Sequence, residues 1–194
     1  MREETVMDRK EALMKLISGN ERYINETCKI GDISPEIRKG TTENGQHPFA
    51  IVITCSDARV IPEAIFSSGI GELFVIRVAG NVIDNHQLGS VEYAADHLGV
   101  KLVMVLGHTH CGAVDAAINH DPAGYIRFLT DEIKEAIGDE KDPFKASCLN
   151  VRRSISRIES SLAIQKDEAE GLAVVGAIYD IETGRVDIID GETL

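Results

Sequence analysis

Two short, almost entirely apolar runs constrain the fold of this chain more than any other feature. They span residues 49–54 (Phe-Ala-Ile-Val-Ile-Thr) and 102–107 (Leu-Val-Met-Val-Leu-Gly). Runs of this length without polar alternation are typical of strands buried on both faces, as in a parallel sheet between two layers of helices. Further strands are expected at 73–78 and 171–179, with helical patterns between the runs. We therefore predict an α/β fold with a mostly parallel central sheet flanked by helices.

The segments around these strands complete the predicted architecture. Helices are expected at 61–67, 87–98, 112–119, 123–137 and 144–161. Gly99 follows the second of them as a C-terminal stop signal. Residues 185–189 form one more strand, joined to 171–179 through the turn 180–184 as a C-terminal β-hairpin. We expect a single domain over residues 1–194, with the α/β core at 49–194.

Residues 1–48 are expected to form an N-terminal helical arm. One face of a helix predicted at 5–24 carries Leu13, Leu16, Ile17, Asn20 and Ile24. A long polar connection, 25–48, then leads to the first strand. Connections of this length are uncommon inside a compact domain, so we expect the helix to pack away from its own core, for example on another subunit. A helix folded back on its own domain is the alternative.

Charge and hydropathy exclude several classes of partner. The formal net charge of −12 argues against nucleic acid, which needs clustered Lys and Arg, and against an anionic membrane surface. No apolar run approaches the roughly 18 residues of a spanning helix, and residues 1–25 are charged and amphipathic without a signal-peptide core. We expect a cytoplasmic protein.

Each of the two apolar runs ends at a cluster of reactive side chains. Cys55 and Asp57 follow the first run, and His108 and Cys111 follow the second. Ligands of open parallel sheets bind beyond the carboxyl ends of the strands, so neighbouring strands would bring these side chains together. Two thiolates and one imidazole suit Zn²⁺, whose tetrahedral shell keeps one position for a carboxylate, water or substrate. The sequence therefore predicts a zinc enzyme.

Asp57 and Arg59 lie close enough in sequence for paired N–H···O bonds. Asp57 then has two options. It binds zinc directly, or Arg59 holds it while water takes the open position. The alternative is a surface ion pair without a role at the metal.

Other residues near the clusters receive weaker predictions. His110 is expected to point away from the metal, and Cys28 and Cys148 are expected to be structural. Gly80 and Asn81 follow a predicted strand end, where their backbone groups can shape the pocket; a simple turn is the alternative.

The combination of these motifs resembles the β-class carbonic anhydrases. Cys-x-Asp-x-Arg at 55–59 is followed by His-x-x-Cys at 108–111. Arg-Val-Ala-Gly-Asn at 77–81, Gly-His-Thr-His-Cys-Gly-Ala at 107–113 and Val-Gly-Ala-Ile-Tyr-Asp at 175–180 are similar too. The resemblance covers residues 8 to 190.

The resemblance implies reversible hydration of CO₂ to bicarbonate and a proton by a zinc-bound hydroxide, which is lyase chemistry. It implies one zinc per subunit on Cys55, His108 and Cys111, with Asp57 as a switchable fourth ligand and Arg59 as its partner. It also implies homodimers or larger homo-oligomers, in which the N-terminal helix is often exchanged between subunits.

Three other functions use a similar site. A carbonyl sulfide or carbon disulfide hydrolase would act on linear analogues of CO₂ with the same metal. A zinc dehydrogenase shares the ligand set but needs a dinucleotide fingerprint, and Gly69-Ile-Gly71 precedes a strand instead of following one. A non-catalytic zinc module would keep Asp57 permanently on the metal.

Overall fold

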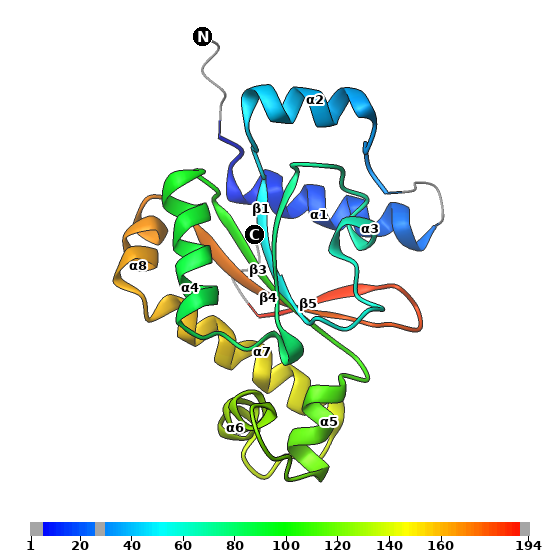
Figure 1. The fold of residues 1–194 in the computed structure, drawn as a ribbon, viewed down its shortest axis with the longest axis vertical. Helices are drawn as coiled ribbons and strands as arrows, with labels where there is room; N and C mark the ends of the chain where they lie inside the picture. The colour runs from blue at the N-terminus through cyan, green and yellow to red at the C-terminus, as the bar shows by residue number, and fades with distance from the viewer. Residues whose placement is uncertain (1–5, 26–29, 191–194) are drawn as a thin grey trace.

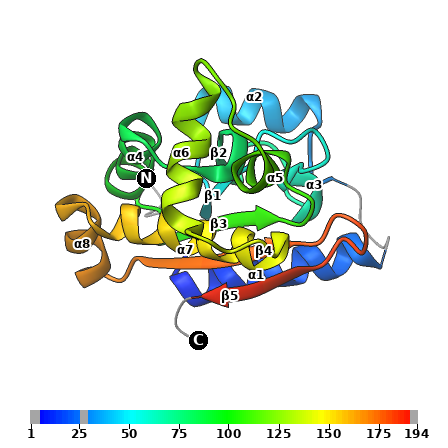
Figure 2. The same cartoon turned by 90° about the horizontal axis from the view of Figure 1, so that it is seen from below.

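The computed structural model of the protein describes residues 6–25 and 30–190. Its centre is a five-stranded sheet in the order β2-β1-β3-β4-β5, whose strands are labelled in Figures 1 and 2. The strands are β1 (Ala50–Thr54), β2 (Leu73–Arg77), β3 (Leu102–His108), β4 (Ala173–Tyr179) and β5 (Val186–Asp190). The first four are parallel, and β5 runs antiparallel to β4. The mostly parallel sheet and the C-terminal hairpin are confirmed.

Helices cover both faces of the sheet (Figures 1 and 2). One face packs against α4 (Asn85–Glu92), α7 (Pro143–Glu159) and α8 (Leu162–Ala169), and the other against α1 (Arg9–Ile24) and α3 (Pro62–Ile65). Side chains of β1 alternate between the two layers: Ile51 and Ile53 face the first, Ala50 and Val52 the second. Every residue of β1 and β3 is buried, which explains their uninterrupted apolar sequences.

A third apolar cluster lies at the carboxyl ends of β1 and β3. It is formed by α5 (Gly112–Asn119), α6 (Ile126–Ile137) and the first turns of α7. Cys55 and Cys111 belong to this cluster. The reactive side chains predicted at the strand ends therefore lie in an apolar surrounding.

The N-terminal helix differs from the prediction in its start and its packing. α1 begins at Arg9, because the Asp8 side chain accepts the first free N–H groups of the helix. Asn20 is buried and donates to the Ile65 and Gly184 carbonyls, and it accepts the Val186 N–H. The expectation that the helix packs away from its own core was wrong, since α3 and the hairpin of the same chain satisfy its buried amide.

The sequence analysis did not predict two helices that the described residues form. α2 (Pro35–Asn44) lies inside the supposed extended connection, capped by Ser34 and started by Pro35, and none of its residues is buried. α8 is capped by Ser161, and only Ile164 and Asp167 of it are buried. A helix that buries so few side chains has no apolar stripe, so its periodicity is invisible in the sequence.

The remaining predicted helices differ from the structure mainly at their ends. The segment predicted at 87–98 is α4 followed by a π-helical turn, Tyr93–His97, and Gly99 ends it with φ +70° as predicted. α6 begins three residues later than expected, at Ile126. Within the described ranges, no helix combines the length and apolar character needed to cross a bilayer.

Candidate metal centre

Cys55, His108 and Cys111 converge at the carboxyl edge of the sheet. β1 and β3 are hydrogen-bonded neighbours in parallel register, so Cys55, just after β1, lies beside His108 at the end of β3. The Sγ atoms of the two cysteines and a ring nitrogen of His108 all lie within 4.8 Å of one another. The three residues are at most 5% exposed. The predicted convergence is confirmed for these three of the four side chains expected at this edge.

The His108 imidazole is oriented to give a lone pair to a metal. Its Nδ1 lies 2.8 Å from the Thr109 carbonyl oxygen. Because a carbonyl only accepts, Nδ1 carries the proton and Nε2 has the free lone pair. Nε2 is buried and has no hydrogen-bond partner among the described residues. A buried nitrogen left unpaired is costly, so an ion at this position would satisfy it.

The two thiols complete a soft donor set. Cys111 is the N-cap of α5, and Cys55 Sγ accepts the Gly80 N–H at 3.3 Å. A hydrogen bond from Cys111 lowers the pKa of Cys55, and sharing that proton with Cys55 raises the pKa of Cys111. Two sulfurs and one neutral imidazole in this arrangement fit Zn²⁺, which prefers these ligands.

Asp57 lies outside this group of three and is held by Arg59. The guanidinium donates from Nε to Oδ1 at 2.9 Å and from Nη2 to Oδ2 at 2.7 Å, and the Arg59 backbone N–H donates to Oδ1. Arg59 also donates to the His110 carbonyl. The guanidinium holds the pKa of the Asp57 carboxyl well below its usual range. The predicted contact between Arg59 and Asp57 is therefore present, and the carboxylate is ionised.

Comparison with known proteins places this chain in a family. The carbonic anhydrase family profile matches residues 50–186. The chain is 36% identical to carbonic anhydrase 2 of Mycobacterium tuberculosis over 187 residues, 90% of each chain. It is also 36% identical to carbonic anhydrase of Mycolicibacterium smegmatis over 163 residues, 78% of this chain and 79% of the relative.

Solved structures of similar fold come from the same family as these relatives. A tetrameric β-carbonic anhydrase from Sordaria macrospora superposes with a TM-score of 0.74 at 28% identity, covering 82% of this chain and 89% of that one. The chain belongs to the β-carbonic anhydrase family. A Coccomyxa β-carbonic anhydrase in complex with acetazolamide gives a TM-score of 0.71 at 28% identity over 93% of this chain and 88% of that one.

β-Carbonic anhydrases are zinc-dependent, and the Cys55, His108 and Cys111 cluster of this member is compatible with that metal.

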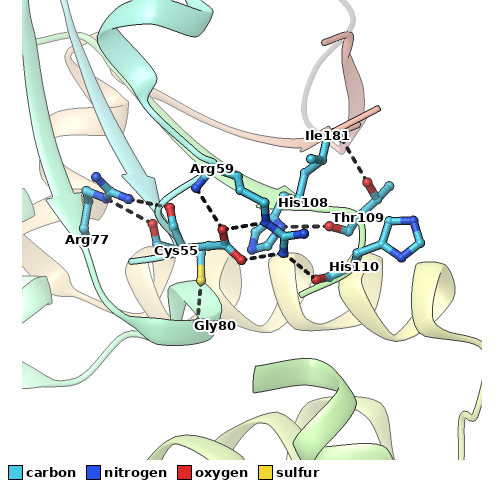
Figure 3. A network of polar contacts seen from close by, with 9 residues as sticks. Cys55, Arg59, Arg77, Gly80, His108, Thr109, His110 and Ile181 are labelled. Atoms are coloured by element: carbon cyan, nitrogen blue, oxygen red, sulfur yellow. Dashed lines mark hydrogen bonds and ion pairs between the residues drawn. The ribbon is translucent and has the colours of Figure 1, made fainter. Parts of the chain in front are cut away.

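Sequence reasoning missed a residue that supports the cluster. Arg77, the last residue of β2, donates to the Cys55 carbonyl at 3.1 Å and to the Asp57 carbonyl at 2.7 Å (Figure 3). It therefore anchors the loop that carries both side chains, a role that the motif at 77–81 did not by itself predict.

The weaker predictions have mixed outcomes. His110 is exposed, and its imidazole points away from Cys55 and Arg59, as predicted (Figure 3). Gly80 acts through its backbone N–H, also as predicted. Cys148 lies partly buried on α7 as a free cysteine. Cys28 lies outside the described residues.

Proposed function

We propose that this β-carbonic anhydrase hydrates CO₂ reversibly to bicarbonate and a proton, with one zinc per subunit held by Cys55, His108 and Cys111. The observation that carries the proposal is the buried, unpartnered Nε2 of His108 beside two thiol sulfurs. Zinc on these ligands would acidify a bound water at physiological pH, which is the chemistry that CO₂ hydration needs.

In this proposal, Asp57 and Arg59 determine whether the fourth coordination position of the metal is open or closed. With both carboxylate oxygens bonded to Arg59, Asp57 is kept from the metal position, which leaves room there for water and substrate. An ionised carboxylate released by Arg59 is a good zinc ligand and would close the site. The two residues together therefore decide whether the centre is accessible.

The ligand assignment is tested with two cysteine variants. Cys55→Ser removes one sulfur of the cluster, whereas Cys148→Ser removes a partly buried thiol on α7 and serves as the matched control. We expect about one zinc per chain and CO₂ hydration in the wild type and in the control, and loss of both in Cys55→Ser. Zinc content is measured by elemental analysis and hydration by stopped flow. Wild-type protein without stoichiometric zinc would refute the proposal.

Asp57→Ala separates the catalytic proposal from a non-catalytic zinc module. If Asp57 is the switchable ligand, the variant keeps its zinc and loses the pH-dependent closure of the site. If Asp57 were a permanent structural ligand, the variant would release zinc and the wild type would hydrate no CO₂ at any pH.

Turnover of carbonyl sulfide and carbon disulfide is measured in the same assay, and a preference for either over CO₂ would assign the site to that hydrolase reaction.

We also propose that the protein acts as a homo-oligomer. The related enzyme from Sordaria macrospora is tetrameric. β2 and β5 are the two edges of the sheet, and edge strands offer free backbone groups to a second copy. Light scattering coupled to size exclusion is expected to give a dimer or a multiple of it, and a monomer at micromolar concentration would contradict this.

A further inference from the structure

The backbone turn that contacts the Cys55 sulfur has an unusual conformation. Residues Ala79–Asn81 follow β2 as a short 3₁₀ turn, in which Gly80 has φ +71° and Asn81 has φ +46°. Two successive left-handed residues, one of them not glycine, are rarely stable without outside support. In this conformation the Gly80 N–H donates to Cys55 Sγ at 3.3 Å (Figure 3).

Two buried side chains of α7 provide that support. Asn150 Nδ2 donates to the Gly80 carbonyl at 2.6 Å, and Ser154 Oγ donates to the Asn81 carbonyl at 2.9 Å. Both side chains are 2% exposed and lie one helical turn apart, so they meet the turn from the same face of α7. The backbone carbonyls of Gly80 and Asn81 are therefore both hydrogen-bonded to side chains of α7.

We propose that Asn150 and Ser154 are positioning residues of the metal centre. Among the described residues, the hydrogen bonds of both side chains go to the turn and not to Cys55, His108 or Cys111; they act by holding the turn that aims the Gly80 N–H at the Cys55 sulfur. A hydrogen bond to a thiolate ligand stabilises its negative charge and fixes its direction, and such outer contacts contribute to metal affinity. The inference rests on the proposed zinc function.

α7 itself offers the matched comparison. Ser147 is on the same helix and is also buried, at 4% exposure, but its hydroxyl donates to the Pro143 carbonyl within the helix. Ser147→Ala and Ser154→Ala thus remove the same buried atom from the same helix. Of the two, only Ser154→Ala removes a hydrogen bond to the turn beside Cys55.

The test measures metal binding in the full chain. Zinc-loaded wild type, Ser154→Ala and Ser147→Ala are mixed with excess chelator, and zinc release is followed in time. Cobalt-substituted samples give the thiolate-to-cobalt charge-transfer absorption, which reports on the sulfur ligands without any activity assay. We expect Ser154→Ala to release zinc about 10-fold faster and to shift the absorption band, because loss of an outer-shell partner costs about 10- to 100-fold in affinity. Ser147→Ala should match the wild type in both.

Asn150→Ala provides a second variant that breaks the other contact with the turn. Wild-type release rates and absorption in both Ser154→Ala and Asn150→Ala would overturn the inference, since the two residues would then serve the fold alone. Changes of equal size in Ser147→Ala would overturn it as well. Wild-type protein that binds neither zinc nor cobalt would overturn the proposed function and this inference with it.

Discussion

Replacing Gly80 by alanine tests how tightly the turn beside the metal centre is enclosed. An alanine with φ near +71° adopts the left-handed conformation, which costs about 1–2 kcal/mol. Its Cβ would also lie 2.7 Å from Ile133 Cδ1 and 3.1 Å from Ala113 Cβ. Overpacking of this kind costs about 1–3 kcal/mol. We therefore expect Gly80→Ala to lower the free energy of unfolding by about 2–5 kcal/mol, a large part of the stability of a typical domain.

The steric part of this cost can be isolated with a second substitution. Ile133→Val removes the Cδ1 atom that the new Cβ would meet, and alone it should cost about 0.5–1.5 kcal/mol. In the double variant the two losses should overlap, with a coupling energy of about 1 kcal/mol or more. Urea unfolding is followed by circular dichroism on metal-free protein, because bound zinc would mask differences between variants.

Gly89→Ala serves as the control for this experiment. Gly89 lies in α4, and a Cβ there would meet no atom within 4 Å. Because glycine is unfavourable inside a helix, this variant should be more stable than the wild type by up to about 1 kcal/mol. A loss below about 1 kcal/mol for Gly80→Ala, or additive effects of Gly80→Ala and Ile133→Val, would refute the reasoning.

Two further predictions concern charged contacts. Arg59→Gln should leave the zinc content unchanged and reduce CO₂ hydration near neutral pH, because Asp57 loses the partner that holds it; Arg153→Gln, in an exposed pair, is the control. Equal stopped-flow rates in all three proteins would contradict the role of Arg59. Burial raises the pKa of Glu72, but hydrogen bonding led by Lys15 outweighs it and lowers the pKa. A lowered pKa gives stability that is present above about pH 4.3 and lost as the pH falls through the folded value. Urea unfolding should show the advantage of wild type over Glu72→Gln shrinking as the pH falls below about 4.3, and parallel curves would disprove it.

Several parts of the fold were predictable because they leave a pattern along the chain. β1 and β3 are buried on both faces, so nearly every position of 50–54 and 102–107 had to be apolar. Parallel strands end at one edge, so the strand pattern alone predicted that Cys55 lies beside His108. α2 left no such pattern, since none of its residues is buried. The long polar connection after α1 also led to a wrong prediction of where α1 packs, because a polar sequence does not reveal which core a helix contacts.

The sequence by itself determined the sheet, most of its helices and the identities of the candidate ligands, because burial and metal chemistry both select residue types. Tertiary structure alone decided what holds those ligands in place. Arg77 and Asn150 act on backbone carbonyls, and the Cys55 sulfur accepts a backbone N–H from Gly80. Backbone groups are the same at almost every residue, so a sequence cannot mark which of them will be used. Their partners, far away along the chain, are chosen only when the helices pack on the sheet.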